Sequence, residues 1–440
     1  MMNRMLTALA ALPLTALLPA AAPVPVPDQA QQRATITALV GFGTRATTST
    51  TTDAKRGIGA ARRWAAARFA RISADCSNCL SIETIGDQFS GPRAPAGVRV
   101  EDVVAVQRGS SDPGRVIIIM AHIDSRNSDA LDGAGDAPGA NDDGSGVALV
   151  IEAARLLSKQ KFPATIVYSL NSGEEQGLWG GQLLAATAKA RGWQVAAVLN
   201  NDIVGNTHGI GGEHIDNRVR VFSEGIRAAA NADAVKAQRV NGGEDDSPSR
   251  SLAKTIRHVA LTNPRLGLEI MAVRRSDRFL RGGDHTPFLE AGYPAVRFTE
   301  ATENYDRQHQ NIRTEAGRQY GDTLDFIDFP YLAKVTAVNV AVARELASAP
   351  AAPADVTIAG AVSDDTHVAW APVVGAAGYR VRWRRADSFD WTDQRDVPAN
   401  ASAADLPRIN IDDHFFGVSA LSAGGAESLV SFAGPAPRKP

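Results

Sequence analysis

The chain has 440 residues, of which 44% are hydrophobic and 21% are charged, as in an ordinary globular protein. Its formal net charge is −2 and it has no long basic run, which argues against nucleic acid as a partner. The length predicts two or three domains and a large hydrophobic core.

Residues 1–22 have the layout of a secretory signal peptide. Arg4 precedes an apolar stretch that Pro13 and Pro19 interrupt, and three alanines end it. A membrane anchor is the alternative, but few of these residues are continuously apolar, and no other segment approaches about 18 apolar residues in a row. We therefore expect export to the periplasm or the medium, with no stable membrane insertion after signal removal.

The two cysteines, Cys76 and Cys79, lie in the sequence CSNC. In an exported protein this spacing favours a small disulfide, with a free or redox-active pair as the alternative. A structural zinc would need two more ligands, and no other cysteine exists to supply them.

Alternating strands and helices are expected through the body of the chain. Residues 30–73 are predicted to be helical, with arginines on the solvated face. From about residue 100, short apolar strands alternate with helices. The expected strands contain RVIIIMAHID, ATIVYSLNSG, VAAVLNNDIV, LEIMAVRRSD and YPAVRFTEA, and the expected helices contain GVALVIEAARLLSK, LLAATAKARG and YLAKVTAVNVAVARELAS. This order predicts an α/β fold over residues 28–346, with a mostly parallel mixed sheet covered by helices.

A second domain is expected at the C-terminal end. Residues 347–356 are rich in Ala and Pro and predict a linker. Residues 357–435 alternate with period two and have glycine-rich turns, which predicts a small all-β sandwich. This segment resembles a fibronectin type III module through Trp370 in VAWAPV, Tyr379 in GYRVRW and the late FFGVSALSAGGAES. The oligomeric state is left open.

Side chains that bind metals follow the predicted strands. In open α/β sheets, ligands gather at the carboxyl ends of the strands. Every residue of interest there is an acid or a histidine: His122, Asp124, Asp142, Asp143, Glu174, Glu175, Asp202 and His309. Singly, each could be a surface residue or a strand-end cap, but together they indicate a metal site.

The composition of this set points to zinc. Imidazole and carboxylate ligands suit zinc and similar divalent ions. One catalytic zinc needs only three protein ligands, so this set contains more potential ligands than a single ion can use. It predicts two zinc ions about 3.5–4 Å apart that share a carboxylate.

Five ordered motifs carry a resemblance to a known family. AHIDS, PGANDDGSG, SGEEQGLWGG, NNDIVGN and QHQ resemble the co-catalytic zinc aminopeptidases, which include bacterial leucyl aminopeptidase, aminopeptidase Y and glutamate carboxypeptidase. The similarity covers roughly residues 100–345. It implies that one zinc is bound by His122 and Asp202, the other by Glu175 and His309, and that Asp142 bridges both. It also implies that Glu174 is the general base and that Asp124 fixes the His122 imidazole.

These roles agree with the chemistry of the residues. Two ions would lower the pKa of a bridging water and polarise the scissile carbonyl. Glu174 would take the proton of the water and pass it to the leaving amine. Asp124 would lie on the same face of the strand as His122 and accept its ring N–H. Small residues around Asp142 would let the backbone approach the metals, and Asp143 would support the site without binding metal.

The segment RGGDHTPF, residues 281–288, matches a family segment beside the active site. Asp284 and His285 are therefore expected to line the cleft or to brace a ligand, with a loop cap as the alternative. Some members of the family carry a tyrosine shortly before this segment that stabilises the oxyanion, whereas this chain reads RRSDRFLRGG. Tyr305 or Arg281 could take its place.

The sequence thus predicts an exported di-zinc exopeptidase that removes N-terminal amino acids from peptides. A carboxypeptidase or a glutaminyl cyclase-like amidohydrolase of the same fold is the alternative. A non-catalytic, receptor-like relative is disfavoured, because such relatives typically lose ligands or the base, and here all of them are present.

Overall fold

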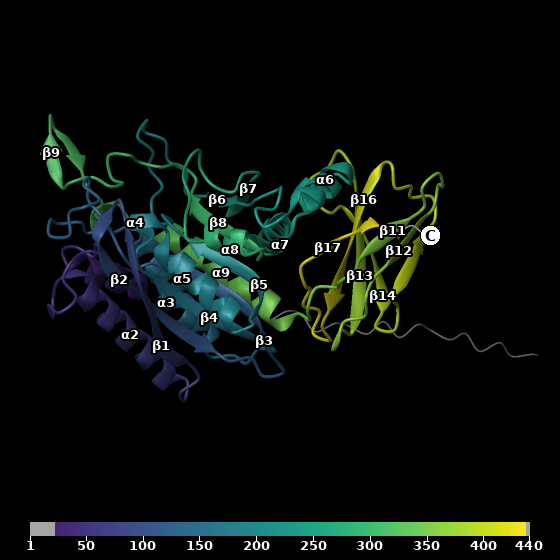
Figure 1. Cartoon of the computed structure of the whole chain (residues 1–440), viewed down its shortest axis with the longest axis horizontal. Helices are drawn as coiled ribbons and strands as arrows, with labels where there is room; N and C mark the ends of the chain where they lie inside the picture. Colours follow the sequence, from purple (N-terminus) through teal and green to yellow (C-terminus); the bar gives the residue numbers. More distant parts are fainter. Residues whose placement is uncertain (1–22, 437–440) are drawn as a thin grey trace, which may run out of the picture.

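The computed structural model describes residues 23–436 (Figure 1). The predicted signal peptide at 1–22 lies outside these residues. Within the described part of the chain, no helix is both long and apolar enough to cross a membrane.

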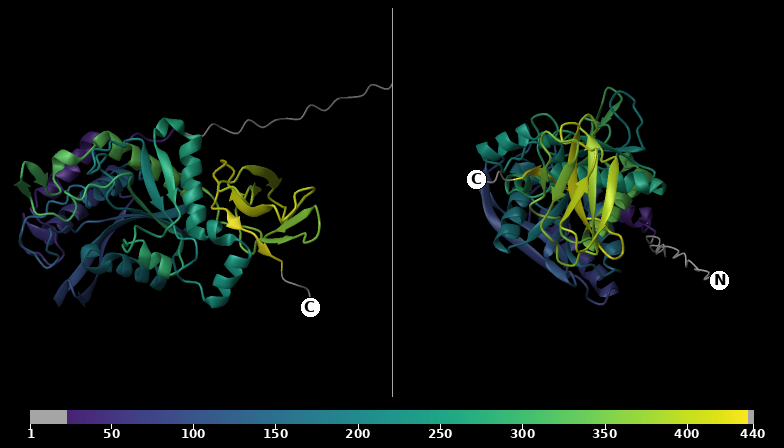
Figure 2. Two further views of the ribbon diagram at one scale, coloured as in Figure 1. Left: turned by 90° about the horizontal axis from the view of Figure 1, so that it is seen from above. Right: turned by 90° about the vertical axis from the view of Figure 1, so that its right-hand side faces the viewer.

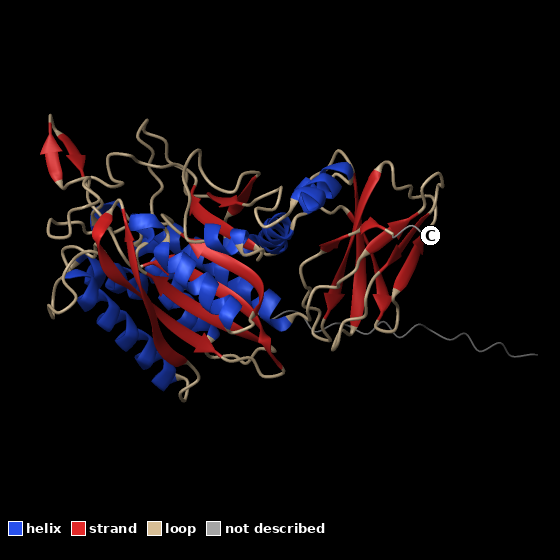
Figure 3. Cartoon of the chain, viewed as in Figure 1, coloured by secondary structure: helices blue, strands red, loops and turns tan. Residues whose placement is uncertain are grey.

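An eight-stranded mixed sheet forms the centre of the first domain (Figure 3). Its order is β1-β2-β4-β3-β5-β8-β6-β7. The four neighbouring strands β4, β3, β5 and β8 are parallel to one another. Antiparallel pairs join β1 to β2, β2 to β4, and β8 to β6. The strands are β1 (Ser81–Gly91), β2 (Ala94–Gln107), β3 (Asp112–His122), β4 (Ala164–Asn171), β5 (Gln194–Asn201), β6 (Arg218–Phe222), β7 (Glu269–Val273) and β8 (Ala295–Glu300).

Helices cover both faces of this sheet. In β3, Ile117 and Ile119 pack into the larger core, whereas Ile118 and Met120 pack into a second core on the other face. A strand buried on both faces needs the continuous apolar run seen in the sequence. The helices are α1 (Gln29–Val40), α2 (Gly57–Asp75), α3 (Gly144–Leu157), α4 (Glu174–Gly177), α5 (Trp179–Ala190), α6 (Ala232–Val240), α7 (Pro248–Thr262), α8 (Thr286–Glu290) and α9 (Phe329–Ser348). The predicted α/β fold with a mixed sheet is confirmed.

Some elements differ from the sequence prediction. The helix expected over 30–73 is two helices, α1 and α2, separated by a loop over 41–56. The β1–β2 hairpin, β6, α6 and α7 were not predicted. β1 has no buried residue and α6 has none either, so neither shows the strong apolar pattern of the central strands.

Cys76 and Cys79 form a disulfide directly after α2, with Cα atoms 5.5 Å apart. The disulfide prediction is confirmed. The α2 helix therefore ends in a closed four-residue turn before the chain enters β1.

The C-terminal segment consists of two four-stranded sheets around one core. Trp370, Tyr379 and Phe416 belong to that core, and the Tyr379 hydroxyl accepts a hydrogen bond from the Val373 N–H at 2.7 Å. The strands are β11 (Thr357–Ala359), β12 (Thr366–Ala369), β13 (Gly378–Arg385), β14 (Asp393–Pro398), β15 (Ala403–Leu406), β16 (His414–Leu421), β17 (Ser431–Phe432) and β18 (Gly434–Pro435). The small β-sandwich is present, and its likeness to fibronectin type III stays a prediction. α9 continues to Ser348, two residues into the predicted linker.

The β-sandwich packs against the first domain at the end opposite the β9 (Arg313–Glu315) and β10 (Arg318–Tyr320) hairpin (Figures 1 and 2). The contact includes buried charges, because Arg384 of β13 and Lys254 of α7 both contact the carboxylate of Asp246. The two domains are therefore joined by a packed interface as well as by the linker.

Candidate metal centre

Neighbouring parallel strands bring the predicted ligands to one edge of the sheet. His122 ends β3, Glu174 and Glu175 begin α4 just after β4, and Asp202 directly follows β5. β4, β3 and β5 are adjacent and parallel, so their carboxyl ends meet. Asp142 comes from the loop between β3 and α3, and His309 from the segment after β8.

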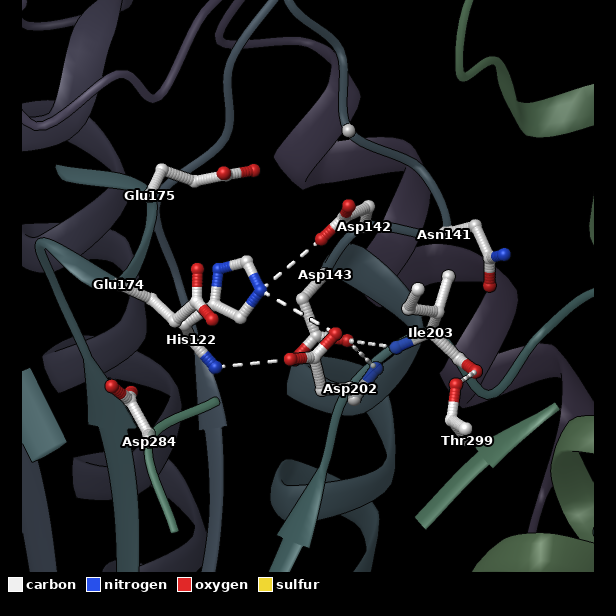
Figure 4. A network of polar contacts seen from close by, with 12 residues as sticks. His122, Asn141, Asp142, Asp143, Glu174, Glu175, Asp202, Ile203, Asp284 and Thr299 are labelled. Atoms are coloured by element: carbon white, nitrogen blue, oxygen red, sulfur yellow. Dashed lines mark hydrogen bonds and ion pairs between the residues drawn. The ribbon is translucent and has the colours of Figure 1, made fainter. Parts of the chain in front are cut away.

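These side chains form two groups, each with potential ligand atoms within 4.8 Å of one another. The members are His122, Glu174 and Asp202 in the first group, and Asp142, Glu175 and His309 in the second. Figure 4 shows the carboxylates of Asp142 and Asp202 facing the His122 ring.

Asp142 connects the two groups. One of its oxygens lies 3.1 Å from Nε2 of His122, and the other lies 3.1 Å from Nε2 of His309. His309 Nε2 is also 3.0 Å from Oε1 of Glu175, and His122 Nε2 is 3.9 Å from Oδ1 of Asp202. A carboxylate placed between two imidazoles is the arrangement expected of a bridging ligand.

Burial and charge dominate the electrostatics of the site. Burial raises the pKa of the Glu174 carboxyl well above its usual range; His122 opposes this shift, and Asp202 and Glu175 add to it. At His309, burial disfavours the charged ring, but Glu175 and Asp142 outweigh it and raise the pKa to about 10. The field that would hold a proton on His309 also attracts a divalent cation.

The donor set fits zinc. Glu175 Oε1 is buried and makes no hydrogen bond within the described residues, so it is available as a ligand atom. All six members of the two groups offer a carboxylate oxygen or an imidazole nitrogen, the donors zinc takes when no cysteine is present.

Asp124 lies beside His122 but contacts it differently from the sequence prediction. The His122 Nδ1 atom is 3.1 Å from the Asp124 main-chain oxygen and 3.6 Å from its carboxylate. The carboxylate of Asp124 accepts hydrogen bonds from the main-chain N–H groups of Glu174 and Glu175, at 3.3 and 3.2 Å. Asp124 therefore ties the Glu174–Glu175 turn to the end of β3.

Asp143 is fully buried, lies beside Asp202 and joins three segments (Figure 4). Its carboxylate accepts hydrogen bonds from the main-chain nitrogens of His122, Gly146 and Ile203, at 3.1, 2.9 and 3.3 Å. It caps α3 and is not a member of either metal-binding group.

The small residues around Asp142 are needed by the loop itself. Gly139 has φ of 52°, and a Cβ atom there would lie 2.5 Å from the Asp142 main-chain oxygen. A Cβ atom on Gly146 would lie 2.3 Å from the Asn201 main-chain oxygen, where α3 approaches β5. A bulkier loop would displace Asp142.

Three buried residues that sequence reasoning missed hold this site in place. The Arg45 guanidinium donates to the main-chain oxygens of Ile123 and Gly139, at 2.8 and 2.9 Å, joining the β3 end to the Asp142 loop. The Asp322 carboxylate accepts a hydrogen bond from the Asp142 N–H at 2.7 Å. Arg297 lies in β8, where an arginine between the apolar residues Val296 and Phe298 of a buried strand was the available signal.

Asp284 and His285 are buried behind the site. Asp284 accepts hydrogen bonds from the Asn171 side chain and the Gly181 N–H, at 2.9 and 3.1 Å, and burial raises its pKa to about 7. His285 Nε2 is 2.8 Å from the Ser276 main-chain oxygen. Neither residue lines the cleft, so both brace the surrounding loops.

A cleft of about 640 Å³ opens onto the two groups. Tyr305 and Arg281, the two candidates for stabilising an oxyanion, both line it. Tyr305 is 55% exposed, and the Arg281 side chain is 33% exposed. Both side chains are therefore accessible from the cleft.

Comparison with known proteins identifies the family. The profile of peptidase family M28 matches residues 102–328. The chain is 42% identical over 409 residues to a protein of Leptosphaeria maculans named "Probable zinc metalloprotease", covering 91% of this chain and 94% of the relative. The chain belongs to peptidase family M28. A similarly named Pyricularia oryzae relative of this M28 chain is 41% identical, covering 93% of this chain and 83% of that protein.

Solved structures share the fold at low sequence identity. The LapA aminopeptidase of Legionella pneumophila has a TM-score of 0.51 and 20% identity, covering 73% of this chain and 72% of that chain. The zinc aminopeptidase BSAP of Bacillus subtilis has a TM-score of 0.52 and 13% identity, covering 74% of this chain and 96% of that chain. This M28 chain is thus a zinc metallopeptidase, and peptides are its substrates.

Proposed function

We propose that the protein is an exported di-zinc aminopeptidase. The observation that carries the proposal is the Asp142 carboxylate, whose two oxygens each lie 3.1 Å from a different histidine. One zinc would be held by His122 and Asp202 and the other by Glu175 and His309, with Asp142 shared. When bound, two zinc ions supply a water of lowered pKa and polarise the scissile carbonyl.

Glu174 would move the proton. It lines the cleft, and burial raises the pKa of its carboxyl, which makes it a stronger base than an exposed glutamate. Its neighbour Glu175 is the proposed ligand, so the same turn would hold Glu174 close to the reacting water. Asp124 fixes that turn through the two main-chain N–H groups. Glu174 would then pass the proton to the leaving amine.

The proposed direction of cleavage follows from the solved structures that share the fold. The solved structures of this fold named above are called aminopeptidases, which favours removal of N-terminal residues. A Porphyromonas gingivalis glutaminyl cyclase shares the fold at a TM-score of 0.50 and 16% identity, so cyclase and carboxypeptidase activities are included in the test.

Export is part of the proposal. The signal-like layout of residues 1–22 and the Cys76–Cys79 disulfide support it, because disulfides persist in oxidising compartments.

The test combines metal analysis with a substrate panel. Protein stripped by a chelator should be inactive, and zinc should restore activity at two ions per chain. Aminoacyl, C-terminal and N-terminal glutaminyl substrates should then be compared, and aminoacyl substrates should be cleaved fastest. Asp142→Asn should weaken the binding of both ions, whereas His367→Gln, in the exposed part of the sandwich, should change neither metal content nor rate. Full activity without metal, or a single bound ion at saturation, would contradict the proposal.

A further inference from the structure

Four arginines line the same cleft as the metal-binding carboxylates: Arg93, Arg126, Arg278 and Arg281. They come from three separate segments. Arg93 lies in the turn between β1 and β2, Arg126 follows β3, and the other two lie in the loop between β7 and α8. Guanidinium groups that converge on one cleft from distant segments indicate a shared ligand.

The protein compensates only part of this charge. Glu303 contacts Arg278 and Arg281, at 3.0 and 3.3 Å, but it also pairs with Arg220 at 2.6 Å. Arg93 donates to the main-chain oxygen of Glu175 at 2.6 Å and forms no ion pair within the described residues. Arg278 also contacts Asp277 at 3.2 Å. Glu303 is therefore shared by three guanidiniums, whereas Arg93 pairs with no carboxylate among the described residues.

Arg126 is the least satisfied of the four. Its side chain is only 15% exposed, yet it makes no hydrogen bond to any described residue, and its Nε is buried and unpaired. Its nearest acid is Glu175, with Nε and Oε2 separated by 3.8 Å, which is too long for a hydrogen bond. That carboxylate already contacts His309. A largely buried guanidinium whose one charged neighbour is too far for a hydrogen bond costs stability, which a bound anion would offset.

The charges of the occupied site lead to the same conclusion. The cleft is lined by four carboxylates, Asp142, Glu174, Glu175 and Asp202. Two divalent cations would balance these four carboxylates, including Glu175, which leaves Arg93 and Arg126 without a carboxylate that compensates them. A substrate entering this cleft meets these two guanidiniums next to the reacting bond.

We infer that the cleft selects peptide substrates that carry a carboxylate close to the scissile bond, and that Arg126 recognises this carboxylate. The inference rests on the proposed peptidase function and names its substrate class. Arginine suits the task because its planar fork can hold a carboxylate with two parallel hydrogen bonds. The carboxylate can be an Asp or Glu side chain or the free C-terminus of a short peptide.

Matched substrates separate these two sources. Glu-Ala amide and Gln-Ala amide differ only in the charged side chain, and Ala-Ala and Ala-Ala amide differ only in the C-terminal charge. The wild-type enzyme should prefer the charged member of at least one pair by about 10-fold or more, as expected for a charge-assisted contact. Arg126→Ala should remove that preference and slow the neutral member less than about threefold, and Arg126→Lys should retain part of it.

The control is Arg313→Ala on the exposed β9 strand, outside the cleft lining. It should keep both the preference and the rate. Zinc content should be measured for every variant, because Arg126 lies beside Glu175. If Arg126→Ala lost zinc and slowed both members of each pair equally, Arg126 would be a support for Glu175, and the inference would be overturned.

Binding gives a readout apart from turnover. Calorimetry on the zinc-loaded protein should show tighter binding of glutamate than of glutamine, or of Ala-Ala than of its amide, and Arg126→Ala should abolish the difference. An enzyme that cleaves aminoacyl substrates with no preference in either pair overturns the inference and leaves the proposed function intact. Carboxylate-selective binding by a protein that cleaves no aminoacyl substrate supports the inference and overturns the proposed aminopeptidase function.

Discussion

Arg297 and Asp202 form a buried ion pair in which Nη2 lies 2.7 Å from Oδ1. Both residues are almost fully buried, at 1% and 2% exposure. Arg297 also contacts Asp277 at 3.1 Å and the Gly282 main-chain oxygen at 2.7 Å. The Arg297 guanidinium thus positions the carboxylate of Asp202, a proposed zinc ligand. Asp277 and the Gly282 main-chain oxygen in turn fix the guanidinium.

Arg297→Met should reduce both stability and metal affinity. Removing one partner from a buried ion pair leaves an uncompensated charge and costs about 3–5 kcal/mol. Denaturant unfolding of the zinc-free protein should show this loss, and zinc titration should show one of the two ions bound more weakly. Asp277→Asn keeps the Arg297–Asp202 contact, so its effect on zinc should be smaller. Equal zinc affinity in wild type and Arg297→Met would show that the pair does not position Asp202.

Glu174→Gln and Glu175→Gln should separate a proton carrier from a ligand. Glu174→Gln should keep both metals while kcat falls by about 10²–10⁴, the usual effect of losing a general base. Glu175→Gln should instead lower the zinc content. Metal analysis and kcat measured on the same preparations check this, and an equal drop in metal content in both variants would show that the two roles are wrongly assigned.

Lys254 at the domain interface should make stability depend on pH. Burial lowers its pKa from 10.5 to about 8, Asp246 opposes this shift, and Arg384 adds to it. The unfolded chain therefore binds the proton more tightly, and this cost is complete below about pH 8 and disappears as the pH rises towards 10.5. From pH 7 to pH 9.5, the free energy of unfolding of the wild type should rise relative to Lys254→Met by about 2 kcal/mol. A difference that does not change with pH would mean that Lys254 is not buried as a charged group.

Truncation after Pro350 should preserve the chemistry and reduce stability. All residues that line the cleft lie between Arg93 and Gln310, and none of them belongs to the sandwich or to the linker. The shortened chain should bind zinc and cleave small substrates at close to the full rate. Its thermal midpoint should fall, because it loses the Arg384–Asp246 contact and the apolar surface packed around it. Zinc binding without any activity on dipeptides would show that the sandwich completes the active site.

The position of the site was predictable because ligands in open α/β sheets gather at the carboxyl ends of the strands. His122, Glu174 and Asp202 each follow a strand whose apolar run identified it, and parallel neighbours must place such residues together. Asp142 could be found because glycines surround it in a loop between a strand and a helix. Sequence periodicity therefore placed the candidate ligands at one edge of the sheet, and the resemblance to the zinc aminopeptidases implied their roles.

The supports around the ligands could not be predicted from periodicity. Asp322 lies in a turn, where an aspartate is common and carries no signal of its contact with Asp142. Arg126 follows the β3 motif but does not belong to the ligand pattern. The β1–β2 hairpin was missed because β1 has no fully buried residue and mixes polar and apolar residues.

The hydrogen bonds from Asn141 and Asp142 to Asp322 have a consequence for how the site is assembled. They join residues that are 181 and 180 positions apart along the chain. During synthesis, the loop with the bridging carboxylate therefore lacks its anchor until the polypeptide has been made well beyond His309. An N-terminal fragment that ends between His309 and Asp322 contains all five proposed ligands and still lacks the anchor of the Asp142 loop, so zinc capture belongs to the end of folding.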